Sequence, residues 1–326
     1  MTTEPAGLTV LVPCYNEGAQ VETAHGELVE ALKEVGELEI LFVDDGSTDD
    51  SLDRIRRLAE TDPRVRYLSF TRNFGIDAVM AAGFRYAGRP WTVQCDADLQ
   101  VPPAEIWSLL DKAGEGYDVV FGERRGRRDP LLRRGGSAGL HWAARRLFGI
   151  DMPRGASTFR LVRTGLAQTI TELRLPWFIP AVPLVGARYA VTPVTHRPRT
   201  AGRSKLRVAR LAAHSFELFF GFSWRPLAAV YAAGALGGCL ALVLAVLGYA
   251  GLVGGSALAA TQLLLTGLTL AAVALLGRYL HRLLRDSARV RTYYIKEANV
   301  PLRPEDTLTG GLPGPPPPAR AVRRNA

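Results

Sequence analysis

Hydrophobic positions in the first part of the chain follow two alternating periodicities. Short runs rich in β-branched residues end at polar or acidic residues, and each is followed by a stretch with apolar residues at helical spacing. Strands that alternate with helices favour a mostly parallel sheet covered on both faces. We expect strands at 8–12, 39–43, 65–70, 91–95 and 117–121, and helices at 21–35, 49–60, 76–87 and 104–113.

The pattern changes in the middle of the chain. Residues 124–134 are dense in Arg and Gly and predict a loop, which is followed by a helix at 137–148. Residues 176–183 are apolar but interrupted by proline, and 196–205 form a second basic loop that contains glycine. Two basic loops are therefore expected beyond the alternating strands and helices.

Two charge-free segments, 227–253 and 257–276, come next. Each has about the 20 apolar residues that a membrane span requires, and 254–256 is a Gly-Gly-Ser turn between them. Basic residues flank the pair on both sides, which places the preceding domain and both termini in the cytoplasm. The alternative is a pair of long buried helices in a soluble bundle. The flanking residues are Lys205, Arg207, Arg210 and Arg225 before the pair, and Arg278, Arg282, Arg285, Arg289, Arg291 and Lys296 after it.

The segments that flank these spans differ from them in composition. Residues 206–226 are amphipathic, which fits a helix at a membrane interface and equally a helix of the globular domain. Residues 301–326 are rich in Pro and Gly and predict a disordered tail. The predicted units are a catalytic domain at 1–205, a juxtamembrane helix at 206–226, membrane helices at 227–253 and 257–276, a cytoplasmic segment at 277–300 and a tail at 301–326.

Composition narrows the possible partners. The net charge of +9 and the pI of about 9.8 suggest an anionic partner, which composition alone leaves open as nucleic acid, lipid head groups or phosphorylated substrates. The three cysteines are odd in number and lack the spacing of a metal site, so a reducing compartment fits best. We see no basic region followed by an apolar core of the kind that forms a secretory signal peptide.

Candidate chemistry gathers where the predicted strands end. Asp96 and Asp98 follow a strand, and two carboxylates so placed can bind a Mg²⁺ or Mn²⁺ ion that also holds a substrate phosphate. Residues 12–17 and 43–49 bring aromatic and carboxylate groups suited to a base and a ribose. Ordinary turns with capping residues are the alternative for each motif taken singly.

The order and spacing of these motifs are more specific than any one of them. Together they resemble family 2 glycosyltransferases, and within that family the polyprenyl-phosphate branch, which includes dolichyl-phosphate mannose synthase and undecaprenyl-phosphate glucosyltransferase. The resemblance runs from about residue 8 to 299. It rests on Pro-x-Tyr-Asn-Glu at 13–17, Asp-Asp-Gly-Ser-x-Asp at 44–49, Arg-Asn-Phe-Gly at 72–75, Asp-Ala-Asp-Leu-Gln at 96–100, Gly-Glu-Arg at 122–124, Phe-Arg-Leu at 159–161 and the basic motif at 199–205.

The resemblance implies a GT-A nucleotide-binding domain, an interface helix, two transmembrane helices and a role for each motif. The nucleotide pocket would be lined by Pro13, Tyr15, Glu17, Asp44 and Asp96. Asp96, Asp98 and Gln100 would hold the metal and the donor diphosphate. The acceptor or donor phosphates would meet Arg124, Arg127, Arg134, Ser137, Arg199, Ser204 and Lys205. Asp98, Arg124 and Lys205 would be the catalytic residues.

The implied reaction is a metal-dependent, inverting transfer of a sugar from a nucleotide-sugar to polyprenyl phosphate. UDP-glucose is the favoured donor, GDP-mannose is the alternative, and a homo-oligomer is a possible assembly. A phosphate monoester is largely dianionic at neutral pH, so the site needs cations to bring two polyanions together more than it needs a strong base. Arginine suits that task because its planar fork forms paired hydrogen bonds with phosphate.

Other functions remain as alternatives. Val101 and Thr158 depart from the branch, which usually has Asp or His and Asp there, so a noncatalytic donor-binding membrane scaffold is one of them. A processive polysaccharide synthase is disfavoured because the Gln-x-x-Arg-Trp motif is missing from the sequence. A nucleic-acid binder is disfavoured because the positive charge gathers around the apolar segments and the phosphate loops.

Overall fold

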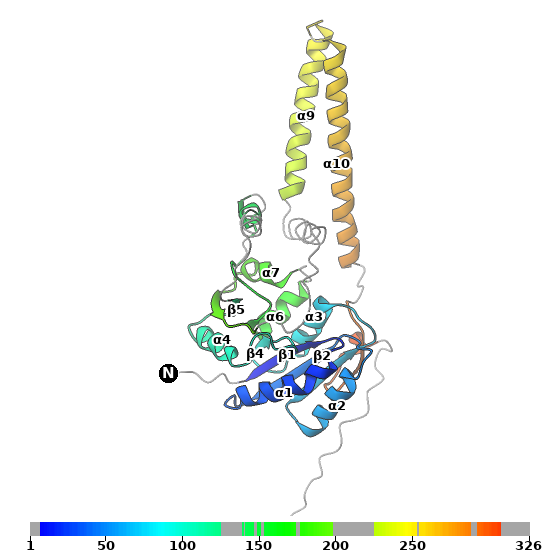
Figure 1. Cartoon of the computed structure of the whole chain (residues 1–326). Coiled ribbons are helices and arrows are strands. Elements are labelled where there is room, and N and C mark those ends of the chain that lie inside the picture. The colour runs from blue at the N-terminus through cyan, green and yellow to red at the C-terminus, as the bar shows by residue number, and fades with distance from the viewer. Residues whose placement is uncertain are drawn as a thin grey trace, which may run out of the picture.

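An eight-stranded sheet with helices on both faces forms the main domain of the computed structural model, and a helical hairpin projects from it (Figure 1). The structure describes residues 7–124, 139, 141–146, 149–150, 153–173, 177–197, 225–252, 254–287 and 292–307. The expected α/β architecture is confirmed. The predicted juxtamembrane helix at 206–226 lies almost wholly outside the described residues.

The sheet is mostly parallel, in the order β7-β5-β6-β4-β1-β2-β3-β8. Only β6 and β8 run against the other strands, β6 between β4 and β5 and β8 at the outer edge of β3. The carboxyl ends of the parallel strands therefore meet at one edge. The strands are β1 (Leu8–Cys14), β2 (Leu38–Asp44), β3 (Val65–Phe70), β4 (Trp91–Gln94), β5 (Val119–Arg124), β6 (Arg160–Arg163), β7 (Tyr189–Val194) and β8 (Ile295–Ala298).

Alternation along the strands builds a core on each face of the sheet. Val10 and Val12 of β1 join one buried cluster, whereas Leu11 between them joins the other, as period-two side chains require. Gly83 lets a helix lie close to the sheet, because a Cβ there would be 2.3 Å from Leu11 Cδ1. The first face is covered by α1 (Gly18–Ala31), α2 (Ser51–Thr61) and α4 (Glu105–Gly114), and the second by α3 (Ile76–Tyr86), α6 (Thr164–Glu172) and α7 (Phe178–Leu184).

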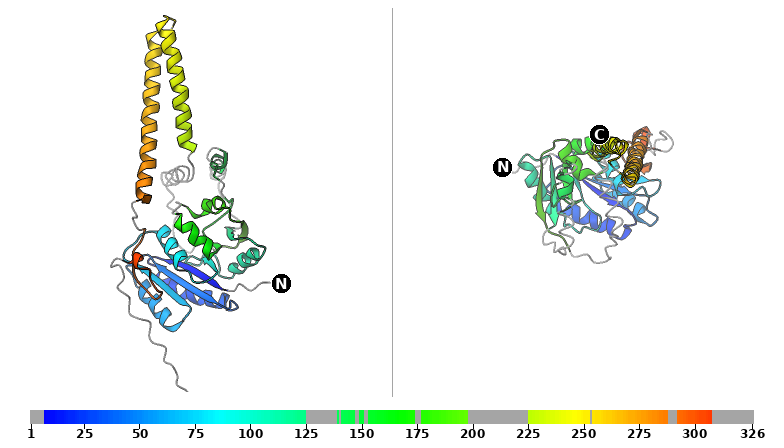
Figure 2. Two further views of the ribbon diagram at one scale, coloured as in Figure 1. Left: turned by 180° about the vertical axis from the view of Figure 1, so that it is seen from behind. Right: turned by 90° about the horizontal axis from the view of Figure 1, so that it is seen from above.

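Two long helices, α9 (Arg225–Tyr249) and α10 (Gly255–Ser287), pack along each other as a hairpin. Both are long and apolar enough to cross a membrane, over Leu227–Tyr249 and Gly255–His281, and almost none of either span is buried within the molecule. Gly237 permits close packing, since a Cβ there would lie 3.2 Å from both Leu265 and Leu268. Seen from behind, the hairpin stands over the side of the domain that holds α3 and β8 (Figure 2).

Residues 292–307, which we name the return segment, lead from the hairpin back to the sheet. They contain β8 and a short 3₁₀ helix, η1 (Pro304–Asp306). The expectation of disorder from residue 301 is wrong for 301–307. Asp306 is buried and accepts a hydrogen bond from Tyr86 Oη at 2.6 Å, so this stretch is fastened to the end of α3. Residues 308–326 lie outside the described residues.

The remaining differences from the sequence-based elements are local. The last predicted strand begins two residues later, as β5, and extends to Arg124, which was expected in a loop. Strands β6, β7 and β8 were not predicted. Residues 141–146 are helical, within the helix expected at 137–148.

Candidate active site

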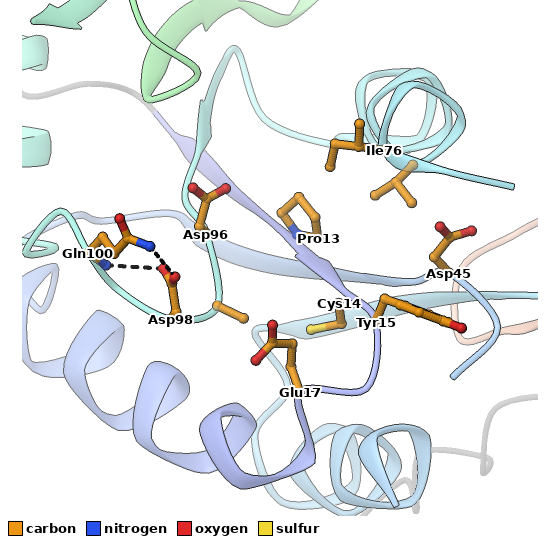
Figure 3. Close-up of a pocket in the computed structure, with 11 residues that line it drawn as sticks. Pro13, Cys14, Tyr15, Glu17, Asp45, Ile76, Asp96, Asp98 and Gln100 are labelled. Carbon is orange, nitrogen blue, oxygen red and sulfur yellow. Dashed lines mark hydrogen bonds between the residues drawn. The ribbon is translucent and has the colours of Figure 1, made fainter. Parts of the chain in front are cut away.

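A pocket opens at the carboxyl ends of β1, β2 and β4, where parallel sheets bind their ligands (Figure 3). Its lining comes from the end of β1 and the turn that follows, from the loop after β2, from the start of α3 and from the loop after β4. The pocket is lined by Pro13, Cys14, Tyr15, Glu17, Asp45, Ile76, Val79, Asp96, Ala97, Asp98 and Gln100. Seven residues were expected to bind the nucleotide, the metal or the diphosphate, and all but Asp44 belong to this lining. Arg124, expected to meet a phosphate, lies on β5.

The turn after β1 is held by the loop after β2. Asn16 has a left-handed backbone, with φ of 55°, which Asn tolerates better than most residues. Its side-chain Oδ1 accepts the Thr48 N–H at 2.9 Å, and its own N–H donates to Ser47 Oγ at 3.0 Å. The Glu17 N–H donates to Ser51 Oγ at 2.9 Å. These bonds fix Glu17 at the pocket and leave Tyr15 46% exposed, so that a base could stack on its ring.

The two adjacent aspartates after β2 have different roles. Asp44 is still part of the strand and is buried, with its carboxylate accepting from Ser69 Oγ at 2.7 Å and from the Ser47 N–H at 3.1 Å. Asp45 lines the pocket and Asp44 does not, and the nucleotide-binding role expected for Asp44 stays a prediction. The Asp45 carboxylate accepts the N–H groups of Phe74 at 2.7 Å and Gly75 at 2.9 Å and lines the pocket. Burial raises the pKa of Asp45, and these two donors oppose that shift.

The loop after β4 turns both of its aspartates outward. Leu99 is buried with a left-handed φ of 46°, and its N–H donates to the Asp96 carbonyl at 3.0 Å. This tight turn leaves the Asp96 and Asp98 side chains exposed at the pocket. Gln100 contacts Asp98 twice, through its backbone N–H at 3.2 Å and its side-chain Nε2 at 2.5 Å. Gln100 thus orients Asp98 through its nitrogen atoms, and its role as a metal ligand stays a prediction.

Negative charge accumulates in this pocket. The surrounding walls raise the pKa of Asp96 although its side chain reaches solvent, and the charge of Asp98 adds to the shift. Burial also raises the pKa of Glu17, with further contributions from Asp98, Asp49 and Asp96. Carboxylates that disfavour one another's charge are suited to a divalent cation, which would relieve the repulsion.

A cation here would need ligands beyond the protein. Across the described ranges no group of three or more His, Cys, Asp or Glu side chains is arranged to hold a metal ion. Mg²⁺ is commonly held by one or two carboxylates together with substrate phosphates and water, rather than by a complete protein cage. Asp96 and Asp98 would suit that arrangement, in which a substrate diphosphate would supply further ligands.

Arg160 provides a buried positive charge near the aspartates and was not among the predicted site residues. Its guanidinium lies 4.1 Å from the ring centre of Phe178 and 5.7 Å from that of Phe84. Burial lowers the pKa of Arg160 to about 10, against the charges of Asp77 and Asp96. In turn Arg160 opposes the upward pKa shift of Asp96. The Phe-Arg-Leu motif was the only sequence signal for this residue.

The second basic loop starts beside the pocket. The Arg197 N–H donates to the Gln100 carbonyl at 2.8 Å, and the Thr195 N–H donates to Glu105 at 3.1 Å. Arg124, at the end of β5, is exposed and near enough to lower the pKa of His196, although burial is the larger cause of that shift. The other predicted phosphate-binding residues lie outside the described residues: Arg127, Arg134, Ser137, Arg199, Ser204 and Lys205.

The two residues that depart from the sequence pattern of the branch, Val101 and Thr158, lie in different surroundings. Val101 is half-buried and packs against the core cluster that contains the β1 residues Val10 and Val12. Thr158 is exposed, next to the buried Phe159. Val101 therefore has a packing role of its own, whereas nothing in the structure explains the threonine.

Similarity to known proteins agrees with this geometry. The sequence profile of the family described as Glycosyl transferase family 2 matches residues 9–170. The chain is 32% identical over 300 residues to a Bacillus subtilis protein named uncharacterized glycosyltransferase YkcC, covering 88% of this chain and 92% of that one. It is 33% identical over 303 residues to the undecaprenyl-phosphate 4-deoxy-4-formamido-L-arabinose transferase of Pseudomonas paraeruginosa, covering 89% of each chain.

Among solved structures, the mannosyltransferase PcManGT from Pyrobaculum calidifontis in complex with GDP-Man and Mn²⁺ is similar, with 22% identity and a TM-score of 0.46. The alignment covers 83% of this chain and 81% of that one. Membership of the family rests on the relatives, whose similarity extends over almost their full length. The chain accordingly belongs to glycosyl transferase family 2 and is a glycosyltransferase that takes its sugar from a nucleotide-sugar.

Proposed function

We propose that this enzyme transfers a sugar from a nucleotide-sugar, with UDP-glucose favoured, to a polyprenyl phosphate such as undecaprenyl phosphate at the cytoplasmic face of a membrane. The observation that carries the proposal is the combination of an acidic pocket at the strand ends with an apolar, unburied helical hairpin on one chain. A relative of 33% identity is named as a transferase acting on undecaprenyl phosphate. Basic residues on both flanks of the hairpin support the cytoplasmic orientation.

The proposed reaction is a direct displacement. An oxygen of the lipid phosphate attacks the anomeric carbon of the sugar, the bond from that carbon to the nucleoside diphosphate breaks, and the configuration inverts. The lipid phosphate is largely dianionic near pH 7 because its second pKa is about 6, so it arrives as a nucleophile without help from a base. The chief task of the protein is to hold two anionic substrates in line.

The residues of the pocket divide this task. Asp45 and Glu17 lie where they can accept hydrogen bonds from a base and a ribose, next to the exposed ring of Tyr15. Asp96 and Asp98 would hold a Mg²⁺ or Mn²⁺ ion, which would neutralise charge on the departing diphosphate. We propose that Arg124 and the basic motif at 199–205, with Arg199, Ser204 and Lys205, meet the acceptor phosphate.

The test is a transfer assay with purified full-length protein in detergent. Undecaprenyl phosphate is incubated with MnCl₂ or MgCl₂ and with labelled UDP-glucose, UDP-N-acetylglucosamine or GDP-mannose in separate reactions. We expect label in the lipid from one donor, lost with EDTA or with Asp98→Ala and retained with Asp111→Ala, a matched change on an exposed position of α4.

Each donor gives a distinct outcome. Transfer from GDP-mannose alone would replace UDP-glucose as the donor while leaving the reaction class intact. If no donor labels the lipid although the protein binds nucleotide, the proposed acceptor is wrong and the noncatalytic scaffold gains weight. Equal activity of Asp98→Ala and the wild type would refute the metal role of that aspartate.

A further inference from the structure

The return segment contacts the residues that lead from β3 to the start of α3, which borders the proposed nucleotide pocket. It leaves the hairpin and pairs with the outer edge of β3, in a register that places Ile295 opposite Phe70 and Glu297 opposite Ser69. Just before that pairing begins, the Thr71 N–H donates to the Tyr294 carbonyl at 3.0 Å. The first residues that the structure describes after the hairpin thus contact the segment that follows β3.

Aromatic rings join the two segments. Tyr293 is buried and stacks on Phe70, with 5.1 Å between ring centroids and nearly parallel planes. Tyr294 meets Phe74 at 6.3 Å, and Phe70 meets Phe74 edge to face at 5.8 Å. All three separations fall within the range of attractive aromatic pairs. Phe74 is therefore held from the side of β3 and from the side of the return segment.

Phe74 in turn shapes the pocket. Its N–H, together with that of Gly75, holds the Asp45 carboxylate that lines the pocket. Gly75 has φ of 94°, and α3 begins at the next residue, Ile76, which also lines the pocket. A shift of the Phe74 backbone would consequently move both the acceptor group of Asp45 and the apolar wall formed by the start of α3.

We propose that Tyr294 is a positioning residue of the donor site, acting through Phe74 on Asp45, so that affinity for a nucleoside diphosphate depends on the segment that returns from the hairpin. This inference rests on the proposed nucleotide pocket. The Tyr294 ring is half-buried and touches Phe74, whereas Tyr293 is deep in the core, so Tyr294 offers the cleaner substitution.

The experiment compares three variants of the full-length protein in detergent: Tyr294→Ala, Tyr294→Phe and Arg56→Gln. The last removes the paired hydrogen bonds of 2.7 and 2.6 Å from Arg56 to Glu297, another attachment of the return segment that lies away from Phe74. Dissociation constants for UDP and for GDP, each with MnCl₂, are measured by calorimetry. Hydrogen exchange of the peptide that contains Phe74 and Gly75 is measured without nucleotide.

We expect Tyr294→Ala to weaken binding of the preferred nucleotide by about two- to tenfold, the range that corresponds to one aromatic pair. Its Phe74 peptide should also exchange faster. Tyr294→Phe and Arg56→Gln should bind like the wild type, because the ring remains in the first and Phe74 is untouched in the second.

Three results would overturn the inference. Wild-type binding and exchange in Tyr294→Ala would show that the ring does not position the pocket. Equal weakening in Tyr294→Ala and Arg56→Gln would reduce the return segment to a general stabiliser. A wild type that binds neither nucleotide would remove the pocket on which the inference depends. Failure of the lipid transfer reaction alone, with nucleotide binding retained, would affect the proposed acceptor and leave the role of Tyr294 standing.

Discussion

Two truncations test whether the end of the return segment belongs to the folded domain. One removes residues 301–326, the whole stretch that the composition predicts to be disordered. The other removes residues 308–326 and keeps the contacts that residues 301–307 make with α3. If composition decided the matter, both truncations would be neutral. The contacts of residues 301–307 predict that the longer truncation lowers stability, and the shorter truncation leaves those contacts in place.

The size of the effect follows from the contacts that are lost. The hydrogen bond from Tyr86 Oη to the buried Asp306 has a charged acceptor and contributes about 1.5–2 kcal/mol. Arg85 loses ion pairs with Asp306 and with the exposed Glu305, together worth about 1 kcal/mol after solvent screening. Leu302, half-buried against the core, adds about 1 kcal/mol. The total is about 3.5–4 kcal/mol, or a decrease in Tm of roughly 7–16 °C.

The assay is thermal unfolding of the three purified proteins in one detergent, followed by circular dichroism. We expect the 308–326 truncation to melt with the full-length chain and the 301–326 truncation to melt several degrees lower. Melting of both truncations within about a degree of the full-length protein would refute the reasoning, since the Tyr86 and Arg85 contacts would then contribute no net stability.

Three further predictions concern the pocket. Asp45→Asn leaves one backbone N–H without an acceptor and should raise KM for the nucleotide-sugar about tenfold. Asp44→Asn should lower Tm and leave KM unchanged. The opposite pattern would exchange the roles assigned to the two residues. Because the folded-state pKa of Asp96 is raised, its charged form costs stability near neutral pH, and that cost vanishes as the pH falls through the raised pKa. Mn²⁺ should therefore raise Tm at pH 7 and progressively less as the pH approaches about 4, and equal stabilisation throughout would contradict a carboxylate site. Gly46→Ala should lower the free energy of unfolding by about 1–3 kcal/mol in chemical denaturation, because φ is +67° and a Cβ would lie 2.4 Å from the Arg72 carbonyl carbon. Gly36 has open space around it, so the control variant Gly36→Ala should be neutral.

The alternating pattern of the chain was enough to predict the parallel half of the sheet. The strands β1 to β4 are buried and rich in β-branched or aliphatic residues, so their signal is local. Strands β6 and β8 have only four residues each, Arg-Leu-Val-Arg and Ile-Lys-Glu-Ala, with charges among them. They are strands because β4, β5 and β3 offer open edges to pair with, and that is information from distant parts of the chain.

The sequence motifs predicted most of the residues that line the pocket, but not the hydrogen bonds that place them. Asp96 and Asp98 lie where the sequence placed them, because a strand end followed by a tight turn determines their direction. Which of Asp44 and Asp45 reaches the pocket depends on the hydrogen bonds that hold each carboxylate, from Ser69 in one case and from Gly75 in the other. Contacts between residues so far apart along the chain leave no local pattern.

Because β8 follows the hairpin in the sequence, the order of synthesis affects how the catalytic domain is completed. Arg56 and Glu297, which fasten β8 to the domain, are 241 positions apart. During translation the outer edge of β3 has no partner until both hairpin helices have been made, and an unpaired edge is prone to pair with other chains. The sheet therefore closes last at β8, and a chain that stops within the hairpin would leave the ribosome with an open sheet edge.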